Sequence, residues 1–203
     1  MLLTHWHPDH IQGVPDLLEH APNTKVYKND PHDDWLPISD GDKFETEGAT
    51  LRAFYCPGHT TDHMAFVLEE EDAMFTADNV LGQGTAVFED LATYMKSLDA
   101  MAKQFRGRAY PGHGPVIEDG PAKISEYINH RKQREKQVLD VLAGDDSGTG
   151  MESMDIVKII YKDYPESLWL PAERGVLQIL DKLKQEGKVG GAETWSLSGK
   201  SSL

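Results

Sequence analysis

The chain has 203 residues, 39% hydrophobic and 27% charged, and no apolar run long enough to cross a bilayer. Its net charge of −14 disfavours generic nucleic-acid binding, which depends on clustered lysine and arginine. The single cysteine, Cys56, excludes an intramolecular disulfide and a thiolate-rich metal site, so any metal ligands should be nitrogen and oxygen atoms. Without a secretion signal at the N-terminus, we expect a soluble, cytoplasmic protein that does not bind membranes.

The first ten residues, MLLTHWHPDH, contain four potential metal ligands within six positions. After an apolar stub the segment resembles the end of a strand, in which residues two apart share a face. His5, His7 and Asp9 would then point in one direction, with His10 turned toward a second position. A single histidine is more often an ordinary loop residue, but four such residues this close together favour a metal site.

The next 130 residues alternate between strand and helix patterns. Strands are predicted at 25–29 and 50–56, and a hairpin at 63–78, where two apolar runs surround the acidic turn 70–72. Helical spacing of apolar residues predicts helices at 88–104 and 121–142, with a short strand between them that breaks at Pro111. This alternation predicts an α/β body.

Residues 151–203 form a separate pattern. Two amphipathic helices are followed by a predicted hairpin at 188–197, with Gly190 and Gly191 near its turn. The apolar positions that define the helices are Ile156, Ile159 and Ile160, and then Val176, Leu177, Leu180 and Leu183. Helices followed by a β-wing predict a winged-helix-like module. This module contains 7 basic and 8 acidic residues, whereas residues 1–150 contain 13 basic and 26 acidic residues. Because the module is not basic, packing against the rest of the protein is favoured over DNA binding.

The glycine-rich segment 143–150 separates these two parts of the sequence. It contains three glycines and two adjacent aspartates, a composition typical of a linker. We therefore expect a catalytic domain at 1–142, a linker at 143–150 and a winged-helix-like C-terminal module at 151–203.

Further potential ligands occur where the predicted strands end. His59 follows YCPG, Asp78 ends MFTAD, and His113 follows AYPG. Each has an ordinary structural explanation, but loops at strand ends are where α/β proteins place their chemistry. Together with the first segment they favour one shared site. We expect Cys56 to be a buried structural residue, and His63 to begin the next strand or to support a ligand.

The order and context of these motifs resemble the metallo-β-lactamase superfamily over residues 2–142. The motifs on which this resemblance rests are HxHxDH at 5–10, PGHT with His59, TAD with Asp78 and PGHG with His113. The stretches GHTTDHMAF, YPGHGPVIEDGPAKI and HRKQRE are similar to a branch that contains fungal lactamase-like thioesterases and a mitochondrial endoribonuclease. Among these thioesterases are the atrochrysone carboxyl-ACP thioesterases of polyketide pathways. The C-terminal part resembles the winged-helix appendage of the same branch.

This resemblance implies a fold and a metal site. The fold is an αββα sandwich, expected here without its N-terminal part because only three residues precede Thr4, so that an apolar sheet face would be exposed. The implied site holds two Zn²⁺ ions, which lower the pKa of bound water for hydrolysis. His5, His7 and His59 would bind the first ion, Asp9, His10 and His113 the second, and Asp78 both. Asp9 would also be catalytic, orienting the water and transferring its proton.

The resemblance further implies a zinc-dependent hydrolase, and we expect a thioesterase of fungal secondary metabolism. It would release a polyketide acyl chain from the acyl carrier protein of a polyketide synthase. A thiol with a pKa of about 8.5 leaves with little acid assistance. The basic segment HRKQREK at 130–136 is the expected docking face for an acidic carrier protein. The alternatives are a metal-dependent endoribonuclease, which requires a basic groove, and an inactive shortened form that does not assemble the fold.

Overall fold

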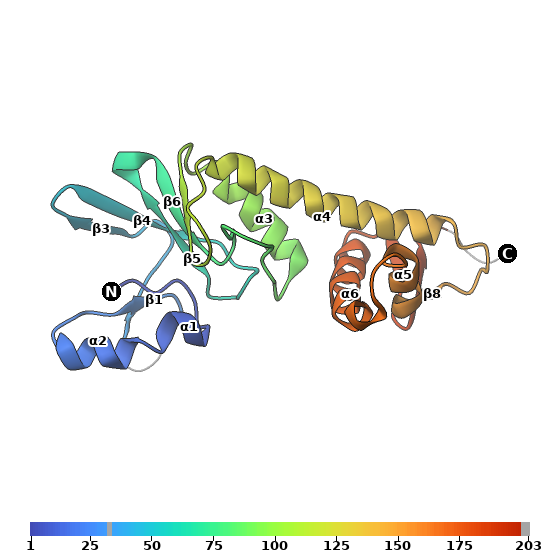
Figure 1. The fold of residues 1–203 in the computed structure, drawn as a ribbon, viewed down its shortest axis with the longest axis horizontal. Helices are drawn as coiled ribbons and strands as arrows, with labels where there is room; N and C mark the ends of the chain where they lie inside the picture. Colours follow the sequence, from blue (N-terminus) through green and yellow to red (C-terminus); the bar gives the residue numbers. More distant parts are fainter. Residues whose placement is uncertain (32–33, 200–203) are drawn as a thin grey trace. The chain divides into compact units, whose positions relative to one another are not determined.

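A computed structural model describes residues 1–31 and 34–199 of the chain. The chain divides into two compact units, Met1–Ile128 and Asn129–Leu203, which are described separately (Figure 1). Their boundary lies inside helix α4 (Gly120–Ala143), upstream of the glycine-rich segment. The domain limits and the linker expected from the sequence therefore stay predictions.

The first unit contains a five-stranded sheet, a two-stranded sheet and several helices. Its elements before α4 are α1 (Pro8–Ile11), α2 (Val14–His20), β1 (Tyr27–Lys28), β2 (Leu36–Pro37), β3 (Lys43–Thr46), β4 (Ala49–Tyr55), β5 (Met64–Leu68), the 3₁₀ turn η1 (Glu69–Glu71), β6 (Ala73–Ala77), α3 (Leu91–Met101) and β7 (Ala109–Pro111). The expected hairpin at 63–78 is confirmed as β5 and β6 joined by η1. The strand expected at 25–29 is shorter than predicted.

Five strands form one mixed sheet in the order β3-β4-β5-β6-β7. All neighbours are antiparallel except β6 and β7, which are parallel. The register places Ala53, Phe66 and Phe75 side by side on one face. Because β5 is central and apolar along its length, it is buried on both faces, as expected for an inner strand.

The two faces of this sheet pack against different partners. On one face, Ala53 and Phe66 belong to a core that includes Ile38 and the partly buried Leu2. Phe75, on the same face, is 39% exposed, so this face is only partly covered in the described structure. On the other face, Arg52 donates to Gln104, just beyond α3. Figure 1 shows α1, α2 and β1 as a group of their own beside the sheet.

The second unit contains helices and a three-stranded sheet. Besides the end of α4, its elements are β8 (Met151–Glu152), α5 (Ser153–Ile160), the 3₁₀ turn η2 (Glu166–Leu168), α6 (Trp169–Gln185), β9 (Val189–Gly191) and β10 (Thr194–Leu197). The predicted hairpin is confirmed as β9 and β10, and β8 completes the sheet in the order β8-β10-β9. Val176, Leu180 and Leu183 on α6 are buried as expected.

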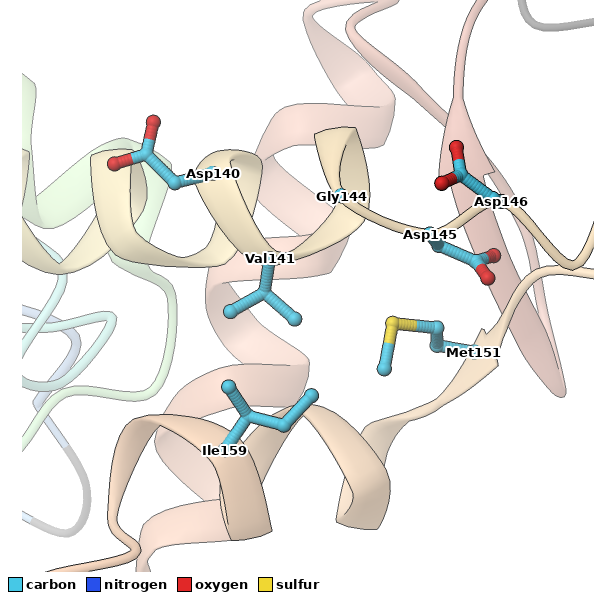
Figure 2. A pocket seen from close by; sticks show the side chains of 7 residues that line it. All are labelled: Asp140, Val141, Gly144, Asp145, Asp146, Met151 and Ile159. Atoms are coloured by element: carbon cyan, nitrogen blue, oxygen red, sulfur yellow. The ribbon is translucent and has the colours of Figure 1, made fainter.

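Ile159 departs from the apolar face predicted for α5, because it is half-exposed whereas Ile156 is fully buried. Its side chain lines an open cavity of about 510 Å³ in the second unit (Figure 2). Val141 and Met151 line the same cavity, with three aspartates on the surrounding segments. None of the potential metal ligands contributes to it. Within the described residues, no helix is both long and apolar enough to span a membrane.

Candidate metal centre

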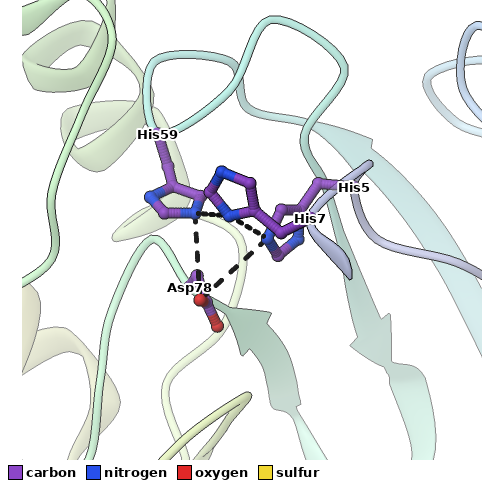
Figure 3. A group of neighbouring side chains, drawn as sticks. All are labelled: His5, His7, His59 and Asp78. Atoms are coloured by element: carbon purple, nitrogen blue, oxygen red, sulfur yellow. Dashed lines mark hydrogen bonds and ion pairs between the residues drawn. The ribbon is translucent and has the colours of Figure 1, made fainter. Parts of the chain in front are cut away.

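Four of the predicted ligands meet in a first donor group, formed by His5, His7, His59 and Asp78 (Figure 3). The Nδ1 atom of His7 lies 3.0 Å from the Nε2 atom of His5 and 3.0 Å from that of His59. The Oδ2 atom of Asp78 lies 3.8 Å from His59 Nε2 and 4.0 Å from His5 Nε2. Three imidazoles and one carboxylate therefore point toward a common centre.

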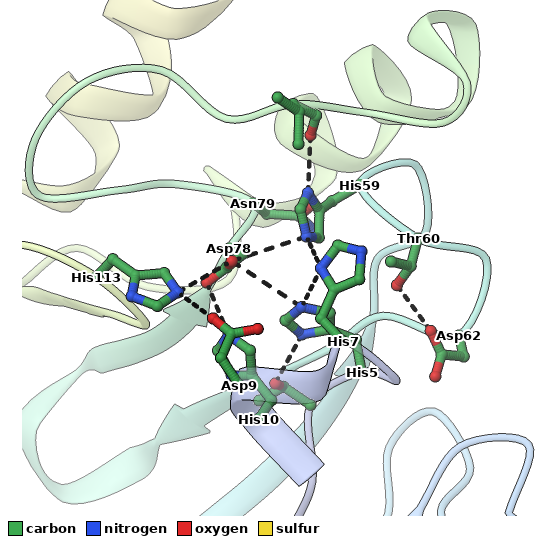
Figure 4. A network of polar contacts seen from close by, with 12 residues as sticks. His5, His7, Asp9, His10, His59, Thr60, Asp62, Asp78, Asn79 and His113 are labelled. Atoms are coloured by element: carbon green, nitrogen blue, oxygen red, sulfur yellow. Dashed lines mark hydrogen bonds and ion pairs between the residues drawn. The ribbon is translucent and has the colours of Figure 1, made fainter. Parts of the chain in front are cut away.

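The other three ligands, Asp9, His10 and His113, form a second donor group (Figure 4). Asp9 Oδ2 is 3.0 Å from His113 Nε2 and 3.6 Å from His10 Nε2. Asp78 also reaches this group, because its Oδ1 lies 3.4 Å from His10 Nε2 and its Oδ2 lies 3.4 Å from His113 Nε2. Asp78 is thus the carboxylate whose oxygens face ligand nitrogens of both groups, and the rings of His5 and His10 also lie side by side, with centroids 4.2 Å apart.

Three of the ligands follow the end of a strand, and the other four lie in and just before α1. His59 lies in the loop between β4 and β5, Asp78 directly follows β6, and His113 follows β7. Strand-like alternation does hold for His5 and His7, but it ends at Pro8, which begins α1. The prediction that Asp9 shares a face with His5 and His7 is therefore wrong, since the helical turn carries Asp9 to the second group.

Backbone and hydroxyl groups orient the imidazole rings. His59 Nδ1 lies 2.8 Å from the carbonyl oxygen of Val87, which can only accept, so Nδ1 carries the proton. The Nε2 lone pair of His59 is then directed into the first donor group. The Oγ1 atom of Thr4 contacts His5 Nδ1 at 3.0 Å and leaves His5 Nε2 facing the same centre. Such outer contacts are typical of metal-binding histidines.

The donor atoms fit a bound cation better than they fit one another. His7 Nδ1 carries at most one proton, yet it faces two other ring nitrogens at 3.0 Å. Where the two groups meet, His10 Nε2 and Asp78 Oδ1 are buried and face each other at 3.4 Å without forming a well-aligned hydrogen bond. Buried polar atoms are normally satisfied, and nitrogen and oxygen donors of this kind suit zinc. The residues present therefore fit divalent metal ions.

The charge states of the first group also suit metal binding. Burial, together with the nearby His10 and His59, holds the pKa of His5 well below its ordinary value, so its ring is neutral at physiological pH. Burial opposes ionisation of Asp78, but contacts with His10, His113 and His5 outweigh it and lower the pKa of this carboxyl. Neutral imidazoles and an ionised carboxylate are the forms that bind metal.

His63 lies next to the first donor group but is not one of its four residues. Its ring is fully buried and stacks on His5 with the ring centroids 5.1 Å apart. Its Nδ1 lies 3.3 Å from the Sγ atom of Cys56, and Met64 begins β5 directly after it. The expectation that Cys56 is buried is confirmed.

Burial raises the pKa of Cys56 to about 12 from an ordinary value of 9.0. We expect a thiol reagent such as DTNB to label the native chain far more slowly than the urea-unfolded chain at pH 8. Because the folded-state pKa is the higher one, this thiol contributes stability that is complete below pH 9 and is lost as pH rises toward about 12. Rapid labelling of the native chain would contradict the buried placement.

Comparison with known families connects this geometry to the sequence motifs. A family model described as the metallo-beta-lactamase superfamily matches residues 1–113, which contain all seven ligands. The chain belongs to the metallo-beta-lactamase superfamily. Members of this superfamily are generally hydrolases and typically bind metal. A second model, the beta-lactamase associated winged helix domain, matches residues 153–195 and confirms the winged-helix prediction.

Two relatives of the chain are proteins of fungi. The chain is 45% identical to the lactamase-like protein nscB of Arthroderma gypseum, over 94% of this chain and 65% of the relative. It is also 45% identical to an atrochrysone carboxyl ACP thioesterase of Aspergillus chevalieri, over 98% of this chain and 68% of the relative. The chain therefore spans about two thirds of the length of these curated relatives.

Solved structures agree with the metallo-beta-lactamase fold. A beta-lactamase domain protein from Burkholderia ambifaria superimposes with a TM-score of 0.80 and 18% identity, covering 97% of this chain and 73% of its own. The metallo-beta-lactamase family protein TTHA1429 from Thermus thermophilus has a TM-score of 0.64 and 27% identity, covering 82% of this chain and 56% of its own. The α/β fold class expected from the sequence is confirmed.

Sequence reasoning missed several residues that surround the centre. Trp6 lies between two ligands and contacts the His7 ring, and the Val87 carbonyl holds His59. Lys28 falls within the strand predicted at 25–29, and Asp62 falls within GHTTDHMAF. A weak signal was present for Asp62, which lies between two histidines, but burial and pairing with a residue 34 positions away leave no local pattern.

Proposed function

We propose that the chain is a zinc-dependent thioester hydrolase that releases a polyketide acyl chain from an acyl carrier protein. The observation that carries the proposal is the pair of donor groups joined by Asp78, a set of ligands suited to two metal ions. The choice of thioester is supported by the 45% identity to an atrochrysone carboxyl ACP thioesterase. His5, His7 and His59 would hold one Zn²⁺, and Asp9, His10 and His113 the other.

The chain's own residues would direct the hydrolysis. Bound zinc would supply an activated water and polarise the thioester carbonyl. The Asp9 side chain is half-exposed beside His113, where substrate and solvent can reach it. Desolvation is the largest single influence on Asp9 and opposes its ionisation, but a hydrogen bond from its own backbone N–H and the nearby charges of His10 and His113 together outweigh it and lower the pKa of Asp9. Asp9 is thus an anion that can accept the proton of the attacking water while the carbon–sulfur bond breaks.

Two exposed apolar side chains lie beside the first donor group. The Trp6 ring makes an edge contact with the His7 ring, with centroids 4.6 Å apart, and is 46% exposed. Val87 is 70% exposed, and its carbonyl oxygen accepts the hydrogen bond from His59. Apolar surface exposed next to a polar site is typical of a ligand contact. We infer that Trp6 and Val87 contact the acyl chain.

Replacing Trp6 should therefore change substrate preference without changing metal content. We expect Trp6→Ala to raise KM for an aromatic acyl thioester about tenfold, the equivalent of ~1.4 kcal/mol, as for a lost aromatic contact. The matched variant Trp6→Phe keeps an aromatic ring and should retain most of the affinity. Steady-state kinetics with aromatic and acetyl thioesters would check this, and equal losses on both substrates would contradict an acyl-chain contact.

The docking face expected at 130–136 is narrower than the sequence indicated. Lys132 and Lys136 are exposed on α4. In contrast, Glu135 is buried, and the Arg134 guanidinium lies over the Tyr161 ring at 4.7 Å. Lys136 is also within 2.6 Å of Asp140, which offsets its charge. We propose that Lys132 and its neighbours on this exposed face receive the acidic carrier protein.

The decisive experiment combines metal analysis with a choice of substrates. The purified 203-residue chain would be assayed for zinc by mass spectrometry, and for hydrolysis of an acyl thioester carried on an acyl carrier protein. We expect close to two zinc ions per chain and a thioesterase activity that EDTA removes and added zinc restores. A zinc-loaded chain that cleaves RNA and leaves thioesters intact would refute the proposal, as would a folded chain that binds no metal.

A further inference from the structure

A buried ion pair lies close to the candidate metal centre. It joins Lys28 on β1 to Asp62 in the loop between β4 and β5, and the side chains are 3% and 5% exposed. Lysine and aspartate are almost never buried this deeply unless they are paired, because desolvating each charge is costly. Each of the two charges can therefore be buried here because the other lies beside it.

The polar atoms around this ion pair are largely satisfied. Besides Asp62, the Lys28 ammonium donates to the backbone carbonyls of Asn29 at 2.8 Å and Asp30 at 3.2 Å. These three acceptors match its three protons. Asp62 Oδ1 accepts a hydrogen bond of 2.7 Å from the Thr60 hydroxyl, as Figure 4 shows. A satisfied network of this kind holds its members in one arrangement.

The ion pair connects two of the three segments that carry the first donor group. Thr60 directly follows His59, so the hydrogen bond to Asp62 acts next to this ligand. On the other side, β1 is bonded to the N-terminal segment through Leu3 N to Tyr27 O at 2.9 Å, two residues before His5. Lys28 is the next residue along β1.

We propose that Lys28 and Asp62 are positioning residues, which fix the His59 loop against the segment that carries His5 and His7. This inference rests on the proposed metal centre and adds the reason why its ligands are close together before metal binds. Ligands held in place need less ordering on binding, so the pair raises metal affinity. Neither residue touches metal or substrate.

Metal affinity and protein stability separate this role from a purely structural one. Zinc affinity of the full chain would be measured by competition with a chelating dye, and stability of the EDTA-treated chain by urea unfolding. Lys28→Met or Asp62→Asn alone leaves one buried charge unpaired, and we expect both stability and zinc affinity to fall. The double variant Lys28→Met/Asp62→Leu removes both charges and should recover the urea midpoint. Its zinc affinity should remain 10- to 100-fold below wild type, roughly the effect of removing outer contacts of metal ligands.

Two further variants keep the test decisive. Thr60→Val retains the ion pair but removes the hydroxyl that donates to Asp62 Oδ1 beside His59, so the urea midpoint should fall as for one lost buried hydrogen bond, and zinc affinity should fall several-fold. The control is Lys182→Met/Glu135→Leu, which removes another largely buried pair, in the second unit, with side chains 11% and 10% exposed. This control should leave zinc affinity unchanged.

The outcomes are distinct. Wild-type zinc affinity in both Thr60→Val and the folded Lys28/Asp62 double variant would overturn the positioning role and leave the metal centre intact. If the double variant does not fold, wild-type zinc affinity in Thr60→Val would be enough by itself to overturn the positioning role. A folded wild-type chain that binds no zinc would instead overturn the proposed function, and the inference with it.

Discussion

Asp78→Asn is expected to remove most of the metal and of the hydrolytic activity, because Asp78 contacts ligands of both donor groups. Its oxygens lie 3.4 Å from His10 Nε2 and 3.4 Å from His113 Nε2, and 3.8 Å from His59 Nε2. Asparagine keeps the shape of the side chain and removes its negative charge. Outer contacts of metal ligands already cost about 10- to 100-fold when lost, so we expect more than about 100-fold loss in kcat/KM.

Metal content and kinetics measured on the same preparation would check this expectation. Asp99→Asn is the matched control, since Asp99 is exposed on α3 in the same unit and the substitution is identical. This control should keep wild-type zinc content and activity. An Asp78→Asn variant that still held two zinc ions with full activity would show that Asp78 does not join the two donor groups.

Gly112→Ala is expected to disrupt the second donor group through a single added methyl group. A Cβ at this position would lie 2.3 Å from Asp78 Oδ1 and 3.0 Å from His10 Cε1, closer than non-bonded atoms approach. Either Asp78 or His10 must move, or the loop that carries His113 must shift. We expect about one zinc ion fewer per chain, with a stability loss of ~1–3 kcal/mol, the usual cost of overpacking.

Zinc stoichiometry and urea unfolding of this variant would be compared with Gly13→Ala. A Cβ at Gly13 would meet nothing within 4 Å, and its backbone φ of −79° suits alanine. Gly13→Ala should therefore match wild type in both measurements. Normal zinc stoichiometry in Gly112→Ala would mean that the second group tolerates a displacement of its ligands, contrary to the geometry described above.

Much of the fold could be predicted from local patterns. The apolar runs on both sides of 70–72 predicted the hairpin, because a central strand buries both faces and reads as continuous hydrophobic sequence. The apolar spacing on α6 predicted its buried side, because a helix that packs on one side repeats every three to four residues. Ile159 shows the limit of this reasoning, since the pattern gives a face but not whether anything covers it.

Prediction of the candidate site was limited by where the local two-residue repeat ends. Alternation correctly paired His5 with His7 but failed for Asp9, since Pro8 starts a helix and ends the two-residue repeat. The resemblance to a family, rather than the local pattern, had assigned Asp9 to the second metal. The assignment of individual ligands to two zinc ions remains a proposal, which the Asp78 and Gly112 variants test.

The sequence by itself determined the alternation of strands and helices, the winged-helix pattern and the positions of histidine and aspartate at strand ends. These features depend on neighbouring residues, whose periodicity is visible in the chain. The family resemblance implied that Asp78 serves both donor groups, and the tertiary structure shows its oxygens facing both, whereas only the tertiary structure decided that Lys28 is buried against Asp62. Both depend on packing between segments far apart in sequence, and the burial that makes a charge pair specific arises only when those segments meet.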